Sequence, residues 1–237
     1  FFNKILPHST LYKRFGGLFS GRKFVQCAEG IQDFIKENDG KMELAIIPIF
    51  DDEKDKEALQ QKTRDEVIAE HWMSDLSKIE DDLQRDHVKA LAWMIADGKL
   101  VIKLIIPEHE DGKLLTREEL MDLDIFKNEV GIFYSKEEGN ESLSFRGVID
   151  VKNEESGEYV SITTSRPWIE SEEKNIKLDF EKFKNFWNNE TYQIGSITCK
   201  IEPLSDKLLE YFEQTAPKSV EEIGPLKKLP TLRTYQE

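Results

Sequence analysis

The sequence predicts an α/β protein whose sheet is mixed, mostly parallel and sandwiched by helices. Up to residue 106, apolar segments of strand length alternate with amphipathic segments of helical length. Connections of that length between consecutive strands favour parallel pairing. The run from Ala45 to Ile49 is apolar without alternation, which is typical of a strand buried on both faces.

The first half of the chain provides three strands with helices between them. Asn38-Asp39-Gly40 ends the first helix and Asp97-Gly98 ends the helical region before the third strand. The expected order is a strand ending within residues 15–20, a helix at 21–38, a strand at 44–50, one or two helices at 63–97 and a strand at 100–106.

The second half predicts a hairpin and a closing helix. Segments 130–134 and 142–145 flank the turn signal Glu138-Gly139-Asn140. The other expected elements are a short helix at 116–119, a strand at 159–165, an amphipathic helix at 171–189 and a short helix at 204–212. We assign residues 1–202 to one domain and residues 203–237 to a helix, a linker and the start of another domain.

Composition limits the classes of function. The 237 residues carry a formal net charge of −14, which argues against non-specific nucleic-acid affinity for the surface as a whole. The longest apolar runs are too short to cross a membrane. Two cysteines, Cys27 and Cys199, fit a reducing, cytoplasmic compartment. The four scattered histidines show no metal-ligand spacing, so we expect no metal.

A local basic site is still compatible with this acidic chain. Lys13, Arg14, Arg22 and Lys23 flank a glycine-rich turn before the first helix, where backbone N–H groups favour anions. On this interpretation they contact nucleic acid. The alternative is a set of solvated cations around a strand–turn–helix corner.

The stretch Phe126–Tyr134 (FKNEVGIFY) is the most informative one. Its pattern favours a buried strand, and an ordinary buried strand is the alternative to the resemblance that follows. It also resembles the active-site strand of the phospholipase-D-like nucleases, where a string like F-H-x-K-x-G-I-F carries a nucleophilic histidine and a phosphate-holding lysine. Lys127 and Glu129 stand at those two places.

Neither replacement suits the chemistry that the resemblance implies. Neutral imidazole attacks phosphorus near pH 7, whereas a lysine is protonated unless it is strongly desolvated. Glu129 differs from a lysine by two charges, and each charge at about 4 Å from a phosphate is worth roughly 1 kcal/mol in water and about 4 kcal/mol near a protein surface. The resemblance therefore implies a pseudo-enzyme without catalytic residues.

A second segment, Phe145–Asp150 (FRGVID), departs from the same pattern. The family has a string like F-S-G-S-x-N-E there, whose serine and asparagine line the phosphate site. Only Gly147 is kept, and it joins Lys127 and Glu129 as a position of the degenerate motif. Arg146 joins the candidate nucleic-acid-binding residues.

Other segments are similar to the phospholipase-D-like domains attached to helicases. Gly16–Gly21 (GGLFSG) is similar to the G-(F/Y)-F-S string that closes the first strand, and its Ser20 is a further candidate nucleic-acid-binding residue. Asp86–Lys103 (DHVKALAWMIADGKLVIK) is the most specific match. The resemblance covers roughly residues 15–200 and implies a phospholipase-D-like nuclease fold.

The segment 229–237 (LPTLRTYQE) resembles the L-R-x-Y-Q string that precedes the nucleotide-binding motif of superfamily two helicases. The glutamine of that string reads adenine, and Gln236 is the matching residue. No G-x-x-x-x-G-K-(S/T) loop occurs in the sequence. The resemblance thus places ATP and Mg²⁺ in a neighbouring helicase domain, and we expect no cofactor in this chain.

Three functions are open at this stage. The first is a degenerate accessory domain of a DNA helicase or translocase from a restriction or antiviral system, which holds DNA or a partner beside its own helicase domain. The resemblance also allows a homodimer, because single-motif members of the family pair. The second is a metal-independent nuclease that uses His109 as nucleophile and Lys127 as phosphate clamp. The third is an acidic protein-interaction or autoinhibitory module.

Overall fold

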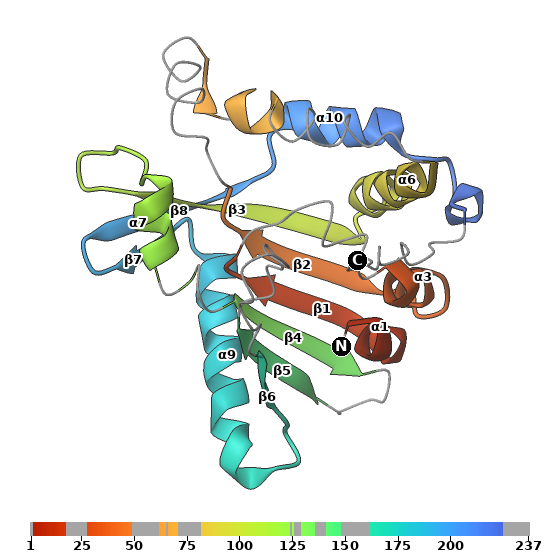
Figure 1. The fold of residues 1–237 in the computed structure, drawn as a ribbon, viewed down its shortest axis with the longest axis horizontal. Coiled ribbons are helices and arrows are strands. Elements are labelled where there is room, and N and C mark those ends of the chain that lie inside the picture. Colours follow the sequence, from red (N-terminus) through yellow and green to blue (C-terminus); the bar gives the residue numbers. More distant parts are fainter. Residues whose placement is uncertain are drawn as a thin grey trace, which may run out of the picture.

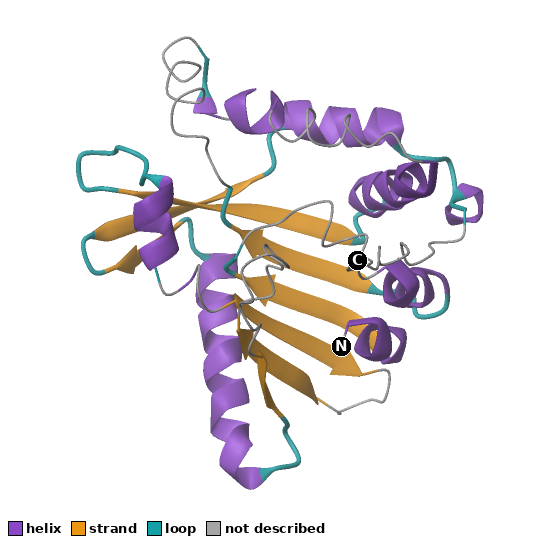
Figure 2. Cartoon of the chain, viewed as in Figure 1, coloured by secondary structure: helices purple, strands orange, loops and turns teal. Residues whose placement is uncertain are grey.

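A central sheet carries helices on both of its faces (Figures 1 and 2). The computed structural model describes residues 2–17, 28–48, 62–64, 66–70, 82–123, 125, 129–135, 141–147 and 162–224. The strands are β1 Ser9–Phe15, β2 Lys41–Ile46, β3 Leu100–Glu108, β4 Glu129–Ser135, β5 Glu141–Gly147, β6 Ile162–Ser165, β7 Thr191–Ile194 and β8 Ile197–Pro203. The helices are α1 Phe2–Ile5, α3 Ala28–Lys36, α6 Asp82–Ala96, α7 Arg117–Asp122, α9 Glu170–Asn188 and α10 Asp206–Thr215, with short 3₁₀ turns at Leu6–His8 and Val220–Glu222.

The sheet is mixed, as predicted, but it is mostly antiparallel, so the expectation of a mostly parallel sheet was wrong. Its order is β6-β5-β4-β1-β2-β3-β8-β7. The strand–helix–strand order of the first half does make β1, β2 and β3 parallel. The strands on either side of these three pair antiparallel. The reason is that hairpin-length connections, such as those between β4 and β5 and between β7 and β8, allow only antiparallel pairing.

The hairpin of β7 and β8 is an element that the sequence analysis missed. Ile194 pairs with Ile197, and Gly195 between them has a φ of +60°. A two-residue connection with glycine in the left-handed region is a common hairpin turn. The predicted turn around residues 138–140 lies outside the described residues, but the pairing of β4 with β5 on either side of it is confirmed.

The first strand ends at Phe15, within the predicted range of 15–20, because two glycines follow it. Gly16 and Gly17 have φ values of +79° and +65°, which leave the extended region. The Gly16 N–H donates to the Ala45 carbonyl at 2.9 Å, and the Ile47 N–H donates to the Gly17 carbonyl at 3.1 Å. The chain thus stays bound to the end of β2 while it turns away from the sheet.

The two faces of the sheet bury different clusters. One face packs against α1, α3, α6 and α10, and its core contains rings from four elements: Phe2, Tyr12, Phe133 and Phe145 form a connected aromatic cluster. The other face is crossed by the long helix α9, which contacts β1, β4, β5, β6 and β7 (Figure 1). Phe183 and Phe186 of α9 are buried there, as the helical spacing predicted.

A smaller prediction is also confirmed: the short helix expected at 116–119 is α7, and Thr116 and Glu119 form a capping box at its start. A turn before this helix closes with a hydrogen bond from the Gly112 N–H to the His109 carbonyl at 2.8 Å. Within the described ranges, no helix combines the length and apolarity needed to span a membrane.

Helix α10 belongs to the core on the face covered by α1, α3 and α6, because it packs against α6 and buries Leu208 and Phe212 completely. The predicted domain boundary between residues 202 and 203 stays a prediction. The packing nevertheless makes residues 206–215 part of the same core as β2 and β3.

Replacing Phe212 by alanine should lower the free energy of unfolding by about 3–5 kcal/mol, because a buried ring is lost and a cavity remains. Urea unfolding followed by far-UV circular dichroism measures this. Glu213→Ala is the control, since Glu213 is the exposed neighbour on the same helix. An unfolding curve for Phe212→Ala that matches the control would contradict the packing of α10.

Candidate functional site

The candidate site lies where β1 ends, beside the start of β4 and the end of β5. The antiparallel register brings these three points together: Phe15 pairs with Val130, and Val130 pairs with Arg146. Ligands of open α/β sheets bind beyond the carboxyl ends of strands, where neighbouring connections diverge. Here β1 has a parallel neighbour on one side and an antiparallel one on the other.

Arg14 and Glu129 form a buried ion pair at this end of the sheet. The Arg14 Nη2 lies 2.7 Å from the Glu129 Oε2, and the two side chains are 6% and 1% exposed. Gly131, opposite Arg14 in the register, leaves room that the Phe145 ring occupies. A Cβ at Gly17 would collide with the Glu129 side chain, so the glycine pair after β1 also makes room for this carboxylate.

Glu129 and Gly147, two of the three degenerate-motif positions, are paired residues of β4 and β5. The third, Lys127, lies outside the described residues, as do Ser20, Arg22, Lys23 and Gln236. Those predictions remain predictions.

Arg14 and Lys13, two of the cations predicted to contact nucleic acid, lie on opposite faces of the sheet. Arg14 is buried with Glu129, on the face of the aromatic cluster. Lys13 lies on the other face under α9, where its ammonium group is 2.9 Å from Glu43 and 5.1 Å from the centroid of the Phe183 ring. Both cations therefore have partners within the fold, and Lys13 stabilises the packing of α9 by a cation–π contact.

Arg146 also lies on the α9 face, where it binds a buried carboxylate. The Arg146 Nε donates to the Asp179 Oδ1 at 2.7 Å, and the Ser144 hydroxyl donates to the Asp179 Oδ2 at 2.8 Å. Asp179 is 0% exposed, whereas 36% of the Arg146 side chain is exposed. The contact joins α9 to β5, and part of the Arg146 side chain stays exposed.

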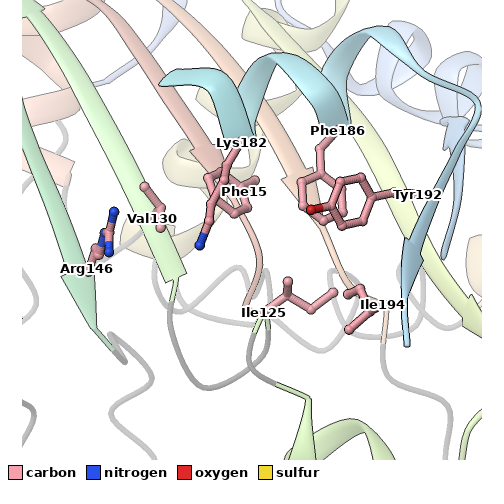
Figure 3. Close-up of a pocket in the computed structure, with 8 residues that line it drawn as sticks. All are labelled: Phe15, Ile125, Val130, Arg146, Lys182, Phe186, Tyr192 and Ile194. Atoms are coloured by element: carbon pink, nitrogen blue, oxygen red, sulfur yellow. The ribbon is translucent and has the colours of Figure 1, made fainter. Parts of the chain in front are cut away.

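A pocket of about 340 Å³ lies next to Arg146, between α9 and the strand ends (Figure 3). Its wall is aromatic on one side, since Phe186 stacks on Phe15 with ring centroids 5.3 Å apart and contacts Tyr192 with centroids 4.2 Å apart. Lys182 extends from α9 into the pocket (Figure 3). Among the described residues, Lys182 has no ion-pair partner, so its charge is available to a ligand.

Lys182, Phe186 and Tyr192 of this pocket were missed as functional candidates. Lys182 and Phe186 are four residues apart, which places them on the same face of a helix. That spacing was a usable signal, because it puts an ammonium group and a ring at the same opening. Tyr192 could not be found this way, since its strand had not been predicted.

His109, the alternative nucleophile, lies in the loop between β3 and α7. Its Nε2 is 3.3 Å from the Glu119 carboxylate, which also accepts hydrogen bonds from the backbone and hydroxyl of Thr116. Hydrogen bonds from Thr116, with a smaller contribution from His109, lower the pKa of Glu119. Arg146 and Lys182 line the pocket, whereas His109 is not among its lining residues. Among the described residues, no three His, Cys, Asp or Glu side chains gather as they would around a metal ion.

Comparisons with protein-family models, curated proteins and solved structures find no match to this chain. The geometry of the site is therefore the evidence that any functional proposal has to use.

Breaking the buried ion pair should be costly. Glu129→Gln leaves the Arg14 guanidinium in the core without its counter-charge, so the free energy of unfolding should fall by about 3–5 kcal/mol in urea denaturation. The double variant Arg14→Met, Glu129→Leu should recover much of this loss, because neither position then holds a charge. Asp111→Asn is the control, since it breaks an exposed ion pair with Lys113 and should barely move the curve. A double variant no more stable than Glu129→Gln would contradict this account.

The Cys199 thiol should be inert in the folded protein. Burial against the α9 face raises its pKa to about 12. A Cys27→Ser variant should therefore fail to react with Ellman's reagent at mildly alkaline pH until urea is added, and should then release one equivalent of thiolate. Rapid reaction of the folded variant would show that Cys199 is accessible.

Proposed function

We propose that this chain is a catalytically degenerate phospholipase-D-like accessory domain of a DNA helicase or translocase, which holds DNA beside the motor. The observation that carries the proposal is the buried pair of Arg14 and Glu129. The resemblance places a phosphate-holding lysine at position 129. The carboxylate found there instead forms an ion pair with Arg14 on the neighbouring strand β1.

The chemistry of that position argues against phosphate binding by Glu129. A carboxylate repels a phosphate where a lysine would attract it, and burial strengthens the repulsion because the local dielectric is low. Its guanidinium partner, on Arg14, is also enclosed. Gly147 pairs with Glu129, so the two altered strings of the motif lie side by side in the sheet. This arrangement supports a site that keeps the scaffold and has lost the reaction.

The order of elements supports the phospholipase-D-like part of the proposal. The parallel strands β1, β2 and β3 come first, the β4–β5 hairpin carries both halves of the motif, and α9 closes over the sheet. A role beside a helicase rests on the string at residues 229–237, with Gln236 reading adenine in the next domain. ATP, Mg²⁺, a cytoplasmic location, contact with the helicase domain and a homodimer belong to the same proposal.

The pocket under α9 supports the DNA-holding part. Two cations line it beside aromatic rings: Lys182, which is exposed and has no ion-pair partner among the described residues, and Arg146, which binds Asp179 but stays partly exposed. Arg14 and Lys13 contact Glu129 and Glu43 elsewhere in the fold. A positively charged groove with rings for stacking is the usual surface for single-stranded nucleic acid. DNA contact is therefore expected at the strand ends on the α9 face.

The purified chain should bind fluorescent single-stranded DNA without metal, should lose affinity as salt rises, and should not cut it. Loss of affinity is expected because neutralised phosphates release counterions, at about 0.7 in log affinity per log salt for each phosphate. Fluorescence anisotropy over a salt series measures binding, and a denaturing gel of the same samples measures cleavage. Double-stranded DNA of the same sequence is the comparison ligand.

Two results would overturn the proposal. Cleavage that is lost in His109→Ala would favour the metal-independent nuclease. Absence of DNA binding, together with salt-sensitive binding to the helicase domain, would favour the acidic interaction module, because screening weakens contacts between opposite charges.

A further inference from the structure

We infer that the pocket under α9 binds one nucleotide of a single strand, with the phosphate at Lys182 and Arg146 and the base against Tyr192. This inference deepens the proposed function, because it names the part of DNA that the domain holds and the residues that hold it. Lys182 and Tyr192 lie outside the degenerate motif, whereas Arg146 belongs to its second string. The pocket is built from α9, β7 and the ends of β1, β4 and β5 (Figure 3).

The charge of the pocket selects an anion. Asp179 offsets one of the two cations, so Arg146, Lys182 and Asp179 together leave a surplus of one positive charge. Asp179 cannot meet a ligand directly, because it is 0% exposed and already accepts hydrogen bonds from Ser144 and Arg146. Its role is to hold the Arg146 side chain in one orientation, since a guanidinium group fixed on one edge presents its other donors in a constant direction.

The aromatic side of the pocket favours a ligand with a planar ring. Phe15, Phe186 and Tyr192 form a continuous series of ring contacts, and Tyr192 is the half-buried member of the series. Phe15 and Phe186 are 2% and 1% exposed, so they support Tyr192 from behind and cannot offer a full face to a ligand. A base stacked on Tyr192 would also cover Ile194, the neighbouring apolar residue of the pocket.

The size of the pocket limits the ligand. A volume of about 340 Å³ lies at the lower end of the range for small-molecule sites, which is about 300–1,000 Å³. One nucleotide suits that space, whereas a duplex does not enter it. The site should therefore prefer single-stranded DNA or a strand end to uninterrupted double-stranded DNA.

The test uses the whole chain and three probes: deoxyadenosine 5′-monophosphate, deoxyadenosine and inorganic phosphate. Isothermal titration calorimetry should show the strongest binding for the monophosphate, because it alone uses both the cations and the ring. Lys182→Ala should weaken that binding at least about tenfold, since a charge-assisted contact to phosphate is lost. Tyr192→Ala should weaken it at least about fivefold through lost stacking.

Matched variants separate recognition from folding. Lys184→Ala removes an exposed charge from the same helix two residues further on, on the side away from the pocket, and should leave binding unchanged. Tyr192→Phe keeps the ring and should bind almost as the parent does, while Lys182→Arg keeps the charge and should retain most of the affinity. Far-UV circular dichroism confirms that each variant is folded.

The outcomes distinguish this inference from the proposed function. If the chain binds single-stranded DNA equally well with and without Lys182 and Tyr192, the inference is wrong and the DNA-holding function stands. If the monophosphate binds and both variants lose it while DNA does not bind, the pocket is a nucleotide site and the DNA-holding function is wrong. If none of the three probes binds the parent chain, the inference is wrong whatever DNA does.

Discussion

The ion pair between Arg14 and Glu129 constrains the end of the sheet on which the candidate site is built. Two charges in a dry core are tolerated only while each is compensated by the other, so β1 and β4 must keep a register that holds them at contact distance. Gly17 has to lack a side chain to leave room for the carboxylate, and Gly131 has to lack one to leave room for a ring. An apolar pair can replace a buried ion pair at little cost in stability, so we expect the pair chiefly to fix geometry.

A second buried carboxylate constrains the opposite face. Asp179 ties α9 to β5 through Ser144 and Arg146, and it is as fully enclosed as the apolar residues around it. The two contacts differ in their consequence for function. The first encloses both charges and leaves nothing for a ligand, whereas the second leaves Arg146 partly exposed at the opening of the pocket. The closed site and the open site thus lie on opposite faces of the same strand ends.

The sequence predicted the parts of the fold that depend on local pattern. The alternation of apolar and amphipathic segments correctly predicted the parallel strands β1, β2 and β3, and helical spacing correctly predicted the buried rings of α9. The antiparallel pairing of β4 with β5 was also predicted correctly. The sheet as a whole was wrongly predicted to be mostly parallel, in part because the β7–β8 turn had been overlooked. For the same reason the pocket was not predicted, since Tyr192 stands on the missed hairpin.

The spacing of residues along the sequence could not reveal which acids the charged residues contact. Lys13 and Arg14 are adjacent in sequence, and consecutive residues of a strand face opposite sides of a sheet, so they could not have formed one basic surface. That argument was available as soon as residues 9–15 were assigned to a strand. What the sequence could not show is the acid that each cation meets, because Glu43, Glu129 and Asp179 come from distant parts of the chain.

The net charge of −14 and the positive pocket act over different distances. An acidic surface repels a nucleic acid at long range, and this repulsion is screened beyond about 8 Å at physiological ionic strength. Lys182 and Arg146 act only on groups that have reached the pocket, where the inferred stacking on Tyr192 would add a contribution that salt does not screen. On the proposed function, the pocket and not the surface as a whole provides the affinity for a single strand, which suits a domain that receives a strand end from an adjoining motor.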